Sequence, residues 1–176
     1  MSQIKPRTQT PGLEFQTLAG HAWKLSDQRP KNLTMVVAYR GLHCPKCEIS
    51  LRELDRLAEE FKSQGVDFVA LSCDTQERAQ QTREKWGLKN VPLGYGLTIS
   101  KAREWGLFIS NGHGKTSTGL EEPAQFSEPG VFLVKPDGTL YASIISTMPF
   151  ARPHFKELSA ALGFVIEKGY PARGEA

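Results

Sequence analysis

Two cysteines stand three residues apart in the run Cys44-Pro45-Lys46-Cys47. The thiolate is the reactive form of cysteine, and a free thiol with a pKa near 8.5 is only about 3% ionised at pH 7. The first turn of a helix stabilises an anion through its unpaired N–H groups and its partial positive charge. The spacing also lets one sulfur reach the other to form a disulfide. The pair therefore predicts thiol redox chemistry, provided that a helix begins at this motif.

The flanking residues indicate a strand before the motif and a helix after it. Residues 33–39 form a near-continuous apolar run, which is typical of a strand covered on both faces. After it, apolar residues recur at helical spacing, with Gly65 as the stop, followed by a second buried strand over residues 66–72. The helical stripe comprises Cys47, Leu51, Leu54, Ala58 and Phe61.

The next segment continues the alternation of strand and helix. The run from Asp74 to Glu77 has the pattern of a capping box that opens a mostly polar helix. That helix is expected to end at Trp86 and Gly87. The order strand–helix–strand–helix indicates parallel strands joined by right-handed crossovers.

The last third of the chain reads as a hairpin and a final helix. Residues 136–138, Pro-Asp-Gly, form a turn signal between apolar runs at 130–135 and 140–145. A final helix is expected with Pro153 near its first turn and Gly163 as its stop.

Two other segments read as a hairpin and a loop. The run around Ala19 and Gly20 indicates a short N-terminal hairpin, and residues 111–128 have no usable period, which predicts a long exposed loop. Residues 112–116 superficially resemble a phosphate-binding loop. That motif needs a glycine where Ile109 stands, which excludes a nucleotide site of this kind.

The composition sets the class of protein. A length of 176 residues is typical of one domain, taken as residues 1–176. The charge of +3 comes from 22 basic and 19 acidic residues that alternate along the chain, which argues against a nucleic-acid partner. No run of 18 apolar residues and no signal-like start is present, so we expect no membrane association and a cytoplasmic location. Three cysteines, an odd number, argue against a structural disulfide framework. The oligomeric state stays open.

The motif lies in a longer run that resembles a known family. Residues 36–47 contain Tyr-Arg-Gly-Leu-His-Cys-Pro-Lys-Cys, which resembles the signature of the peroxiredoxin-like branch of the alkyl hydroperoxide reductase/thiol-specific antioxidant (AhpC/TSA) family. Residues 11–26 resemble the family's N-terminal hairpin, and residues 129–139 resemble its late strand pair. The resemblance implies an α/β thioredoxin-like fold: a mixed central sheet flanked by helices, with an N-terminal β-hairpin extension.

The resemblance also implies which residues form the site. Cys44 and Cys47 become the catalytic pair, with two alignments in competition for their roles. The thioredoxin alignment makes Cys44 the exposed attacking thiol, which we favour, and the peroxiredoxin alignment gives that role to Cys47. Arg40, Glu128 and Pro129 become candidate substrate-binding residues.

In the peroxiredoxin alignment Arg40 stands where the family has proline, and Cys44 stands where it has threonine. Pro129 matches the cis-proline that thioredoxin folds place opposite the cysteine pair, so a cis bond is expected there. Glu128 would raise a thiol pKa if it pointed inward, and we favour an outward, solvated side chain.

Several other residues are weaker candidates. Cys73 is expected to be a buried apolar residue, with a role as a distant resolving thiol as the alternative. His43 is either a donor to a leaving thiolate or a half-exposed structural imidazole. Arg103 and Arg152 are possible sources of positive charge, but the sequence places neither of them near Cys47.

We therefore expect a thiol-dependent antioxidant enzyme. It would reduce hydrogen peroxide or an alkyl hydroperoxide through a Cys44–Cys47 disulfide that an external dithiol restores, with no cofactor and no metal. The first alternative is a thioredoxin-like thiol–disulfide oxidoreductase acting on protein or small-molecule disulfides. The second is a non-enzymatic metal-binding protein of the same fold, although a single pair of cysteines falls short of the usual four zinc ligands.

Overall fold

The computed structural model describes residues 4–176. Its strands are β1 (Glu14–Thr17), β2 (Ala22–Lys24), β3 (Leu33–Ala38), β4 (Val66–Leu71), β5 (Leu93–Tyr95), β6 (Ile109–Asn111), β7 (Gln125–Ser127), β8 (Gly130–Val134) and β9 (Leu140–Ile145). Its helices are α1 (Pro45–Arg56), α2 (Ala58–Ser63), α3 (Gln76–Trp86), α4 (Ile99–Glu104) and α5 (Phe155–Lys168), with a short 3-10 helix η1 (Leu25–Asp27). Over residues 4–176, no helix is both long and apolar enough to cross a membrane.

The strands form a mixed sheet with β3 near its middle. Within the described residues, seven strands pair in the order β2-β1-β5-β4-β3-β8-β9, and β6 pairs with β7 apart from them. Strand β3 runs parallel to β4 and antiparallel to β8. All six of its residues are buried, which explains its unbroken apolar sequence. The expected thioredoxin-like α/β fold, with its N-terminal hairpin β1–β2, is confirmed.

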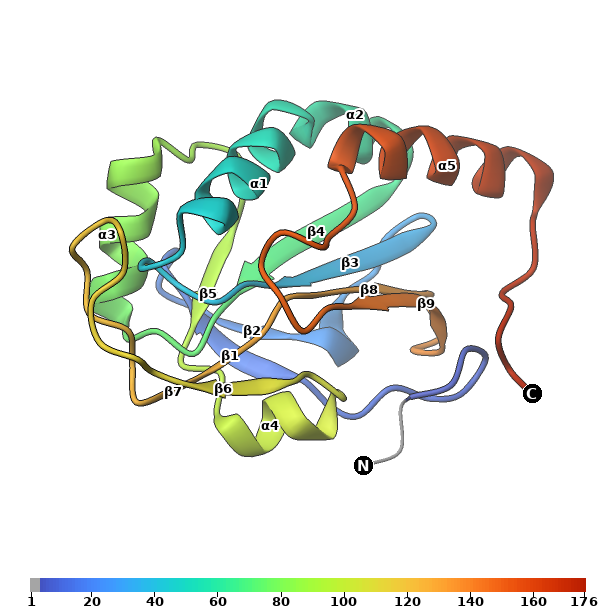
Figure 1. The fold of residues 1–176 in the computed structure, drawn as a ribbon. Coiled ribbons are helices and arrows are strands. Elements are labelled where there is room, and N and C mark those ends of the chain that lie inside the picture. Colours follow the sequence, from blue (N-terminus) through green and yellow to red (C-terminus); the bar gives the residue numbers. More distant parts are fainter. Residues whose placement is uncertain (1–3) are drawn as a thin grey trace.

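The sheet separates two apolar cores, because successive side chains of a strand point to opposite faces. Met35 and Val37 of β3 belong to the core beneath α1, α2 and α5, whereas Val36 and Ala38 belong to the core that includes Trp105 beside α4. Figure 1 shows α1, α2 and α5 along one face of the sheet and α4 on the other. Helix α1 thus lies directly over the strand that precedes it.

Local signals near the cysteines are confirmed. The stripe predicted from Cys47 to Phe61 is buried along α1 and α2, and Gly65 adopts the left-handed conformation that ends this helical segment (φ 71°). The turn at residues 136–138 joins β8 to β9 with Gly138 at φ 81°. These features depend on neighbouring residues only, so the sequence pattern is sufficient to predict them.

Two helix boundaries were predicted incorrectly. Thr75, and not Asp74, caps α3 by accepting a hydrogen bond from the Arg78 N–H. Helix α5 continues through Gly163 and ends at Lys168, with Gly169 in the left-handed conformation (φ 59°). The free energy gained by packing one face of α5 on the core outweighs the small free-energy cost of a glycine within the helix. Pro153 lies before the helix, whose N-cap is His154.

Residues 111–128 are not one exposed loop. Their ends form the pair β6–β7, and Phe126, Ser127 and Glu128 are buried. Only residues 112–124 form a loop between these short strands. A three-residue strand is too short to give a detectable period in the sequence, which is why the pattern failed here.

Candidate functional site

The two cysteines lie where β3 leads into α1. Cys44 is the N-cap of α1, and its Sγ accepts a hydrogen bond from the Cys47 N–H at 3.3 Å. Pro45 occupies the first turn, where its missing N–H costs nothing. Both side chains are buried, Cys44 at 1% exposure and Cys47 at 0%. The expectation that Cys44 is an exposed thiol is therefore wrong, because the segments around the turn cover it.

Arg152 contacts the sulfur of Cys47. Its Nη2 lies 3.2 Å from the Cys47 Sγ, and its Nε donates to the Pro149 carbonyl at 2.7 Å. These two contacts fix the guanidinium against the thiol from a segment 105 residues further along the chain. Sequence reasoning identified Arg152 as a possible source of charge without placing it. The other candidate, Arg103, lies on α4, across the sheet from α1.

The surroundings of the two sulfurs shift their pKa values in opposite directions. Burial alone would raise the pKa of Cys47, but the hydrogen bond from Cys44 and the charge and hydrogen bond of Arg152 outweigh burial. Together with the Arg40 backbone N–H, they lower the pKa of Cys47 from 9.0 to about 6. The pKa of Cys44 is raised, first because its thiol donates to Cys47 and second because it is buried. At neutral pH, Cys47 is thus the thiolate and Cys44 the neutral thiol beside it.

Arg40 lies at the centre of an ion-pair network next to the motif. Its Nη2 is 3.3 Å from the Glu122 carboxylate, and its Nε is 3.6 Å from that of Glu128. The guanidinium also lies 4.7 Å from the centroid of the Phe126 ring. These contacts join the end of β3 to the segment that leads into β8.

Glu128 is buried, so the expectation of an outward, solvated side chain is wrong. It is 3% exposed, and it accepts a hydrogen bond from the Ser110 hydroxyl at 2.6 Å. A carboxylate is buried at low cost only beside a cation and hydrogen-bond donors. Arg40 and Ser110 provide these partners, which explains the inward orientation.

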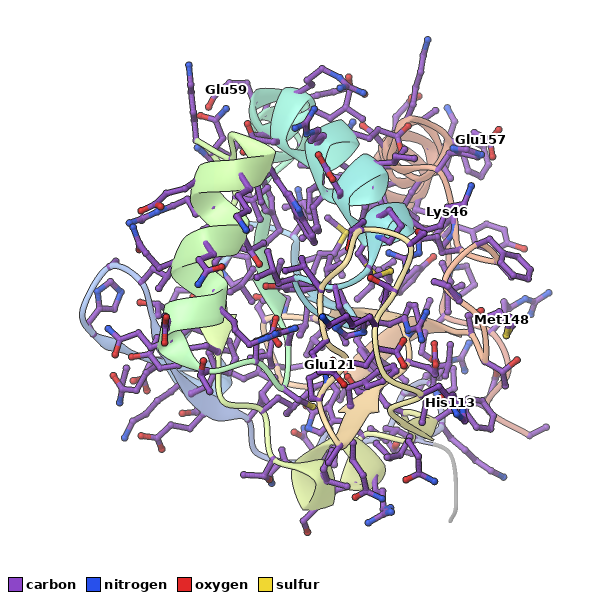
Figure 2. The ribbon with its side chains drawn as sticks, turned by 60° about the vertical axis from the view of Figure 1, so that its left-hand side comes forward. Lys46, Glu59, His113, Glu121, Met148 and Glu157 are labelled. Carbon is purple, nitrogen blue, oxygen red and sulfur yellow. The ribbon has the colours of Figure 1, made fainter. Side chains whose placement is uncertain are left out.

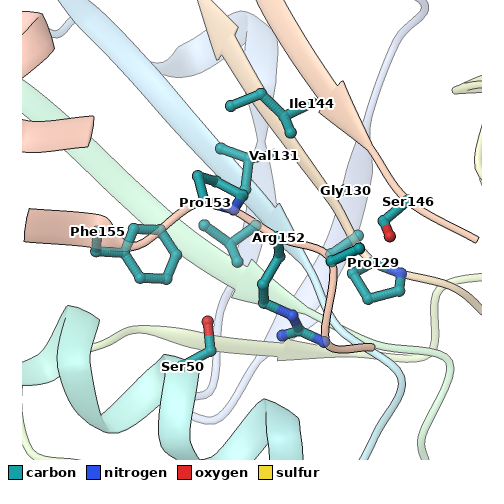
Figure 3. Close-up of a pocket in the computed structure, with 12 residues that line it drawn as sticks. Ser50, Pro129, Gly130, Val131, Ile144, Ser146, Arg152, Pro153 and Phe155 are labelled. Atoms are coloured by element: carbon teal, nitrogen blue, oxygen red, sulfur yellow. The ribbon is translucent and has the colours of Figure 1, made fainter. Parts of the chain in front are cut away.

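Pro129 lies beside the end of β3, because the next residue, Gly130, pairs with Ala38. Together with Ser50 and Arg152 it lines a cavity of about 10 Å³, which has room for about one water molecule. Figure 3 shows Arg152 between these two residues. No peptide bond in residues 4–176 is cis, so the expected cis bond before Pro129 is wrong. The trans form is intrinsically favoured, and a proline that precedes a strand removes no ladder hydrogen bond.

Asp74 supports the turn that carries the cysteines. Its buried carboxylate accepts from the Leu42 N–H at 2.7 Å and from the Arg78 Nε at 2.7 Å. Gly41 lies against it with φ 136°, and a Cβ at this position would be 2.7 Å from the Asp74 Oδ2. Sequence reasoning gave Asp74 only a capping role. The Tyr-Arg-Gly element of the motif was a signal for this contact, since only glycine fits here.

The remaining candidates have no polar contact with the cysteine pair. His43 is fully buried, its ring is 4.7 Å from that of Phe126, and neither ring nitrogen has a hydrogen-bond partner among the described residues. Burial lowers the pKa of His43 to about 4, so the imidazole is neutral, and the expectation of a half-exposed ring is wrong. Cys73 packs against the core on the opposite face of the sheet from Cys44 and Cys47.

Metal ligands do not gather around the pair. Among residues 4–176, no group of three histidine, cysteine or carboxylate side chains lies close enough together to hold a metal ion. This arrangement gives the metal-binding alternative no support. The site is thus defined by a buried thiolate, a neighbouring thiol and a guanidinium.

A strand-to-helix dithiol on a mixed α/β sheet defines a thiol-redox protein of the thioredoxin-like class. The model of the AhpC/TSA family matches residues 6–143, and the chain belongs to this family. The chain is 25% identical over 135 residues to the thiol-disulfide oxidoreductase ResA of Halalkalibacterium halodurans, covering 70% of this chain and 73% of that protein. The chain is therefore a thiol-dependent redox enzyme.

Solved structures share the fold. The peroxidoxin BcpB from Mycobacterium tuberculosis superimposes with a TM-score of 0.71 at 19% identity, over 93% of this chain and 99% of that one. A peroxiredoxin-like protein from Aquifex aeolicus gives a TM-score of 0.74 at 15% identity, over 94% and 90% of the two chains.

Proposed function

We propose that this protein is a thiol peroxidase in which Cys47 attacks the peroxide and Cys44 resolves the product. The observation that carries the proposal is the contact of 3.2 Å between the Arg152 guanidinium and the Cys47 Sγ. A guanidinium at this distance stabilises the thiolate before the reaction and the developing negative charge on the leaving oxygen during it. This assignment reverses the preference for Cys44 that the sequence alone suggested.

The proposed cycle has three steps. The Cys47 thiolate attacks one oxygen of the peroxide, the O–O bond breaks, and the leaving alkoxide or hydroxide takes up a proton. The Cys47 sulfenic acid then condenses with the Cys44 thiol to form the disulfide and release water. Finally, an external dithiol reduces this disulfide by two successive exchange steps and is itself oxidised to a disulfide.

The cavity at Arg152 supports a small substrate. Its volume of about 10 Å³ fits a group close to the size of water, and Ser50 and Pro129 form two of its walls. A neighbouring groove of about 170 Å³, which includes Lys46 and Phe150, also reaches Arg152. We propose that one oxygen of the peroxide occupies the cavity beside Pro129. Arg40 acts through its backbone N–H toward Cys47, and its side chain, with Glu128, holds the surrounding segments in place.

Rapid-mixing kinetics test the peroxidase proposal. The fully reduced protein is mixed with hydrogen peroxide, alongside the variants Cys44→Ser and Cys47→Ser. We expect oxidation far faster than that of a free thiol, lost in Cys47→Ser and retained in Cys44→Ser, which would stop at the sulfenic acid. A rate no better than that of a free thiol in all three proteins would sink the proposal.

One observation favours a second candidate, a thiol–disulfide oxidoreductase. The Cys44 Sγ accepts a hydrogen bond from the Cys47 N–H, which keeps the two cysteines together at the start of the helix, and the curated relative from Halalkalibacterium halodurans is named for this activity. Fast reduction of insulin or of glutathione disulfide, combined with slow oxidation by peroxide, would select this function. In both cases we propose a cytoplasmic location, because the cycle needs a continuous supply of reduced dithiol.

A further inference from the structure

Residues 112–124, here called the strap, connect β6 to β7 and lie beside the cysteine turn. Figures 1 and 2 both show this segment next to the N-terminal end of α1, where Cys44 and Cys47 lie. At its base, the ring of Phe126 packs 4.7 Å from that of His43, the residue before Cys44. The strap thus lies beside the turn, and its base packs on the residue that precedes Cys44.

Polar contacts hold the strap in place. None of residues 112–124 belongs to either core. Among the described residues, its polar contacts with the rest of the molecule are the Glu122–Arg40 ion pair at 3.3 Å and a hydrogen bond of 3.3 Å from Arg78 to the Glu121 carbonyl. A segment with few apolar contacts opens at a low cost in free energy compared with global unfolding. The strap is therefore a segment that can open while the fold stays intact.

The side chain of Glu122 makes the main contact that holds this segment in place, and it is here called the latch. Its carboxylate contacts Arg40 with one oxygen and accepts from the His113 N–H with the other at 2.8 Å. Both partners of the ion pair are largely buried, with side-chain exposures of 10% for Glu122 and 18% for Arg40. An ion pair so shielded from solvent is worth more than an exposed one. The adjacent Glu121 is exposed and makes its contact through its backbone carbonyl alone.

We propose that Glu122 is a specificity-determining residue: its ion pair with Arg40 keeps the strap closed over Cys44, so that bulky disulfides and protein thiols reach this sulfur only when the strap opens. On the proposed function, peroxide-sized reactants approach from the other side, at the Arg152 guanidinium that contacts the Cys47 Sγ and lines both the cavity and the groove. The inference rests on the proposed function, since it divides the cycle into a peroxide step with the strap closed and a reduction step with the strap open.

The experiment compares a bulky and a small thiol reagent on the reduced full-length protein. Cys47→Ser combined with Cys73→Ser serves as the background, so that only Cys44 reacts. The bulky probe is 5,5′-dithiobis(2-nitrobenzoate) and the small one is methyl methanethiosulfonate. In each reaction a thiolate attacks the probe sulfur, a mixed disulfide forms, and one sulfur leaving group departs. The quantity measured is the ratio of the rate constant with the bulky probe to the rate constant with the small probe.

We expect Glu122→Gln to raise this ratio about tenfold. The bulky probe reacts only with the open form of the strap, so its rate follows the population of that form. Losing a hydrogen bond to a charged group raises that population by about a factor of ten. Glu121→Gln is the matched control: it removes the same charge one residue away, and we expect its ratio to stay within about twofold of the background protein. It therefore corrects for the electrostatic attraction of the anionic probe.

Two results would overturn the latch. One is a ratio in Glu122→Gln within twofold of the background protein, and the other is an equal rise in Glu121→Gln. Amide exchange gives a second measurement, since the His113 N–H should exchange faster in Glu122→Gln alone. Neither reagent is a peroxide, so these rates do not depend on the peroxidase proposal. A failure of that proposal shows only in the rate with hydrogen peroxide, whereas a failure of the proposed role of Glu122 shows only in the ratio of the two probe rates.

Discussion

At the scale of single residues, the contact between Arg152 and Cys47 decides the chemistry of the site. The helix N-terminus and the Cys44 thiol both favour an anion at Cys47, but the guanidinium adds a full positive charge in a buried place. A charge there interacts more strongly than in water, because the surrounding dielectric constant is low. Removing it should therefore change the acidity of Cys47 and the rate of the peroxide step together.

The first prediction concerns Arg152→Met. We expect the pKa of Cys47 to rise from about 6 toward its ordinary value of 9.0, and the rate with hydrogen peroxide to fall about 10- to 100-fold. The pKa is measured from the thiolate absorbance near 240 nm as a function of pH, with Cys73→Ser as background, which keeps the Cys44 thiol beside Cys47. Arg103→Met, on the opposite face of the sheet, is the control and should change neither quantity. An unchanged pKa in Arg152→Met would contradict the assignment.

The second prediction is the pH profile of peroxide oxidation. A lowered pKa means that the thiolate is present above pH 6 and is lost as the pH falls through 6. We expect a plateau in the rate above about pH 7 and a tenfold fall per pH unit well below 6. Stopped-flow rates of the fully reduced protein between pH 4.5 and 8.5 measure it. A midpoint near 8.5, the value of a free thiol, would show that the thiolate is not stabilised.

At the scale of elements, the loop between β3 and α1 is held by a contact from the end of β4. The Asp74 carboxylate binds the Leu42 N–H and lies against Gly41, so two parallel strands jointly position the N-cap Cys44. Parallel strands carry such residues at the same edge of the sheet, where functional loops also lie. The geometry of the cysteine pair therefore depends on a residue 30 positions downstream.

The third prediction tests this contact with Gly41→Ala. A side chain at φ 136° is strained, and its Cβ would overlap the Asp74 carboxylate, so we expect the free energy of unfolding to fall by about 2–4 kcal/mol. Gly87→Ala is the matched control, because Gly87 also has a positive φ (62°) but a Cβ added there would have no atom within 4 Å among the described residues. It should lose only about 1–2 kcal/mol. Urea unfolding measures both, and equal losses would contradict the proposed contact.

The fourth prediction concerns α5, which continues through Gly163. The nearest group to a Cβ there is the Gln64 Nε2 at 3.9 Å, an ordinary contact, so Gly163→Ala should stabilise the protein by about 0.5–1 kcal/mol. Gly169→Ala should destabilise it, because Gly169 ends the helix in the left-handed conformation. Thermal unfolding monitored by circular dichroism compares the two. A loss of stability in Gly163→Ala would show that this helix does not tolerate a side chain there.

At the scale of the whole molecule, the sheet separates the cysteines into two groups. Cys44 and Cys47 lie in the core under α1, and Cys73 packs against the core on the other face. A disulfide needs two cysteines whose Cβ atoms point toward each other, which side chains on opposite faces of a sheet do not do without rearrangement. We infer that residues 4–176 form one domain, because both cores share the same sheet.

The fifth prediction follows from this separation. After treatment with one equivalent of hydrogen peroxide, peptide mapping should find a Cys44–Cys47 disulfide and a free Cys73 thiol. Cys73→Ser should keep the full rate of turnover with an external dithiol. A disulfide between Cys73 and either residue of the pair would show that the working cycle includes a rearrangement across the sheet.

Local sequence patterns specify the elements that position the chemistry. The apolar run of β3, the helical stripe from Cys47 to Phe61 and the turn at residues 136–138 are patterns of neighbouring residues, and each of them appears in the structure as predicted. The motif also identified the cysteine pair and its place at a helix start. The boundaries that failed, Gly163 in α5 and the ends of the 111–128 segment, depend on core contacts that no local pattern contains.

Only the tertiary structure decided which sulfur is the thiolate and what surrounds it. Arg152 is 105 residues from Cys47, and Glu122 is 82 residues from Arg40. Contacts over such separations depend on how helices and loops pack on the sheet, and the spacing of residues in the chain does not specify them. The burial of Cys44 and Glu128 has the same origin, because burial is produced by segments that meet only after the chain has folded.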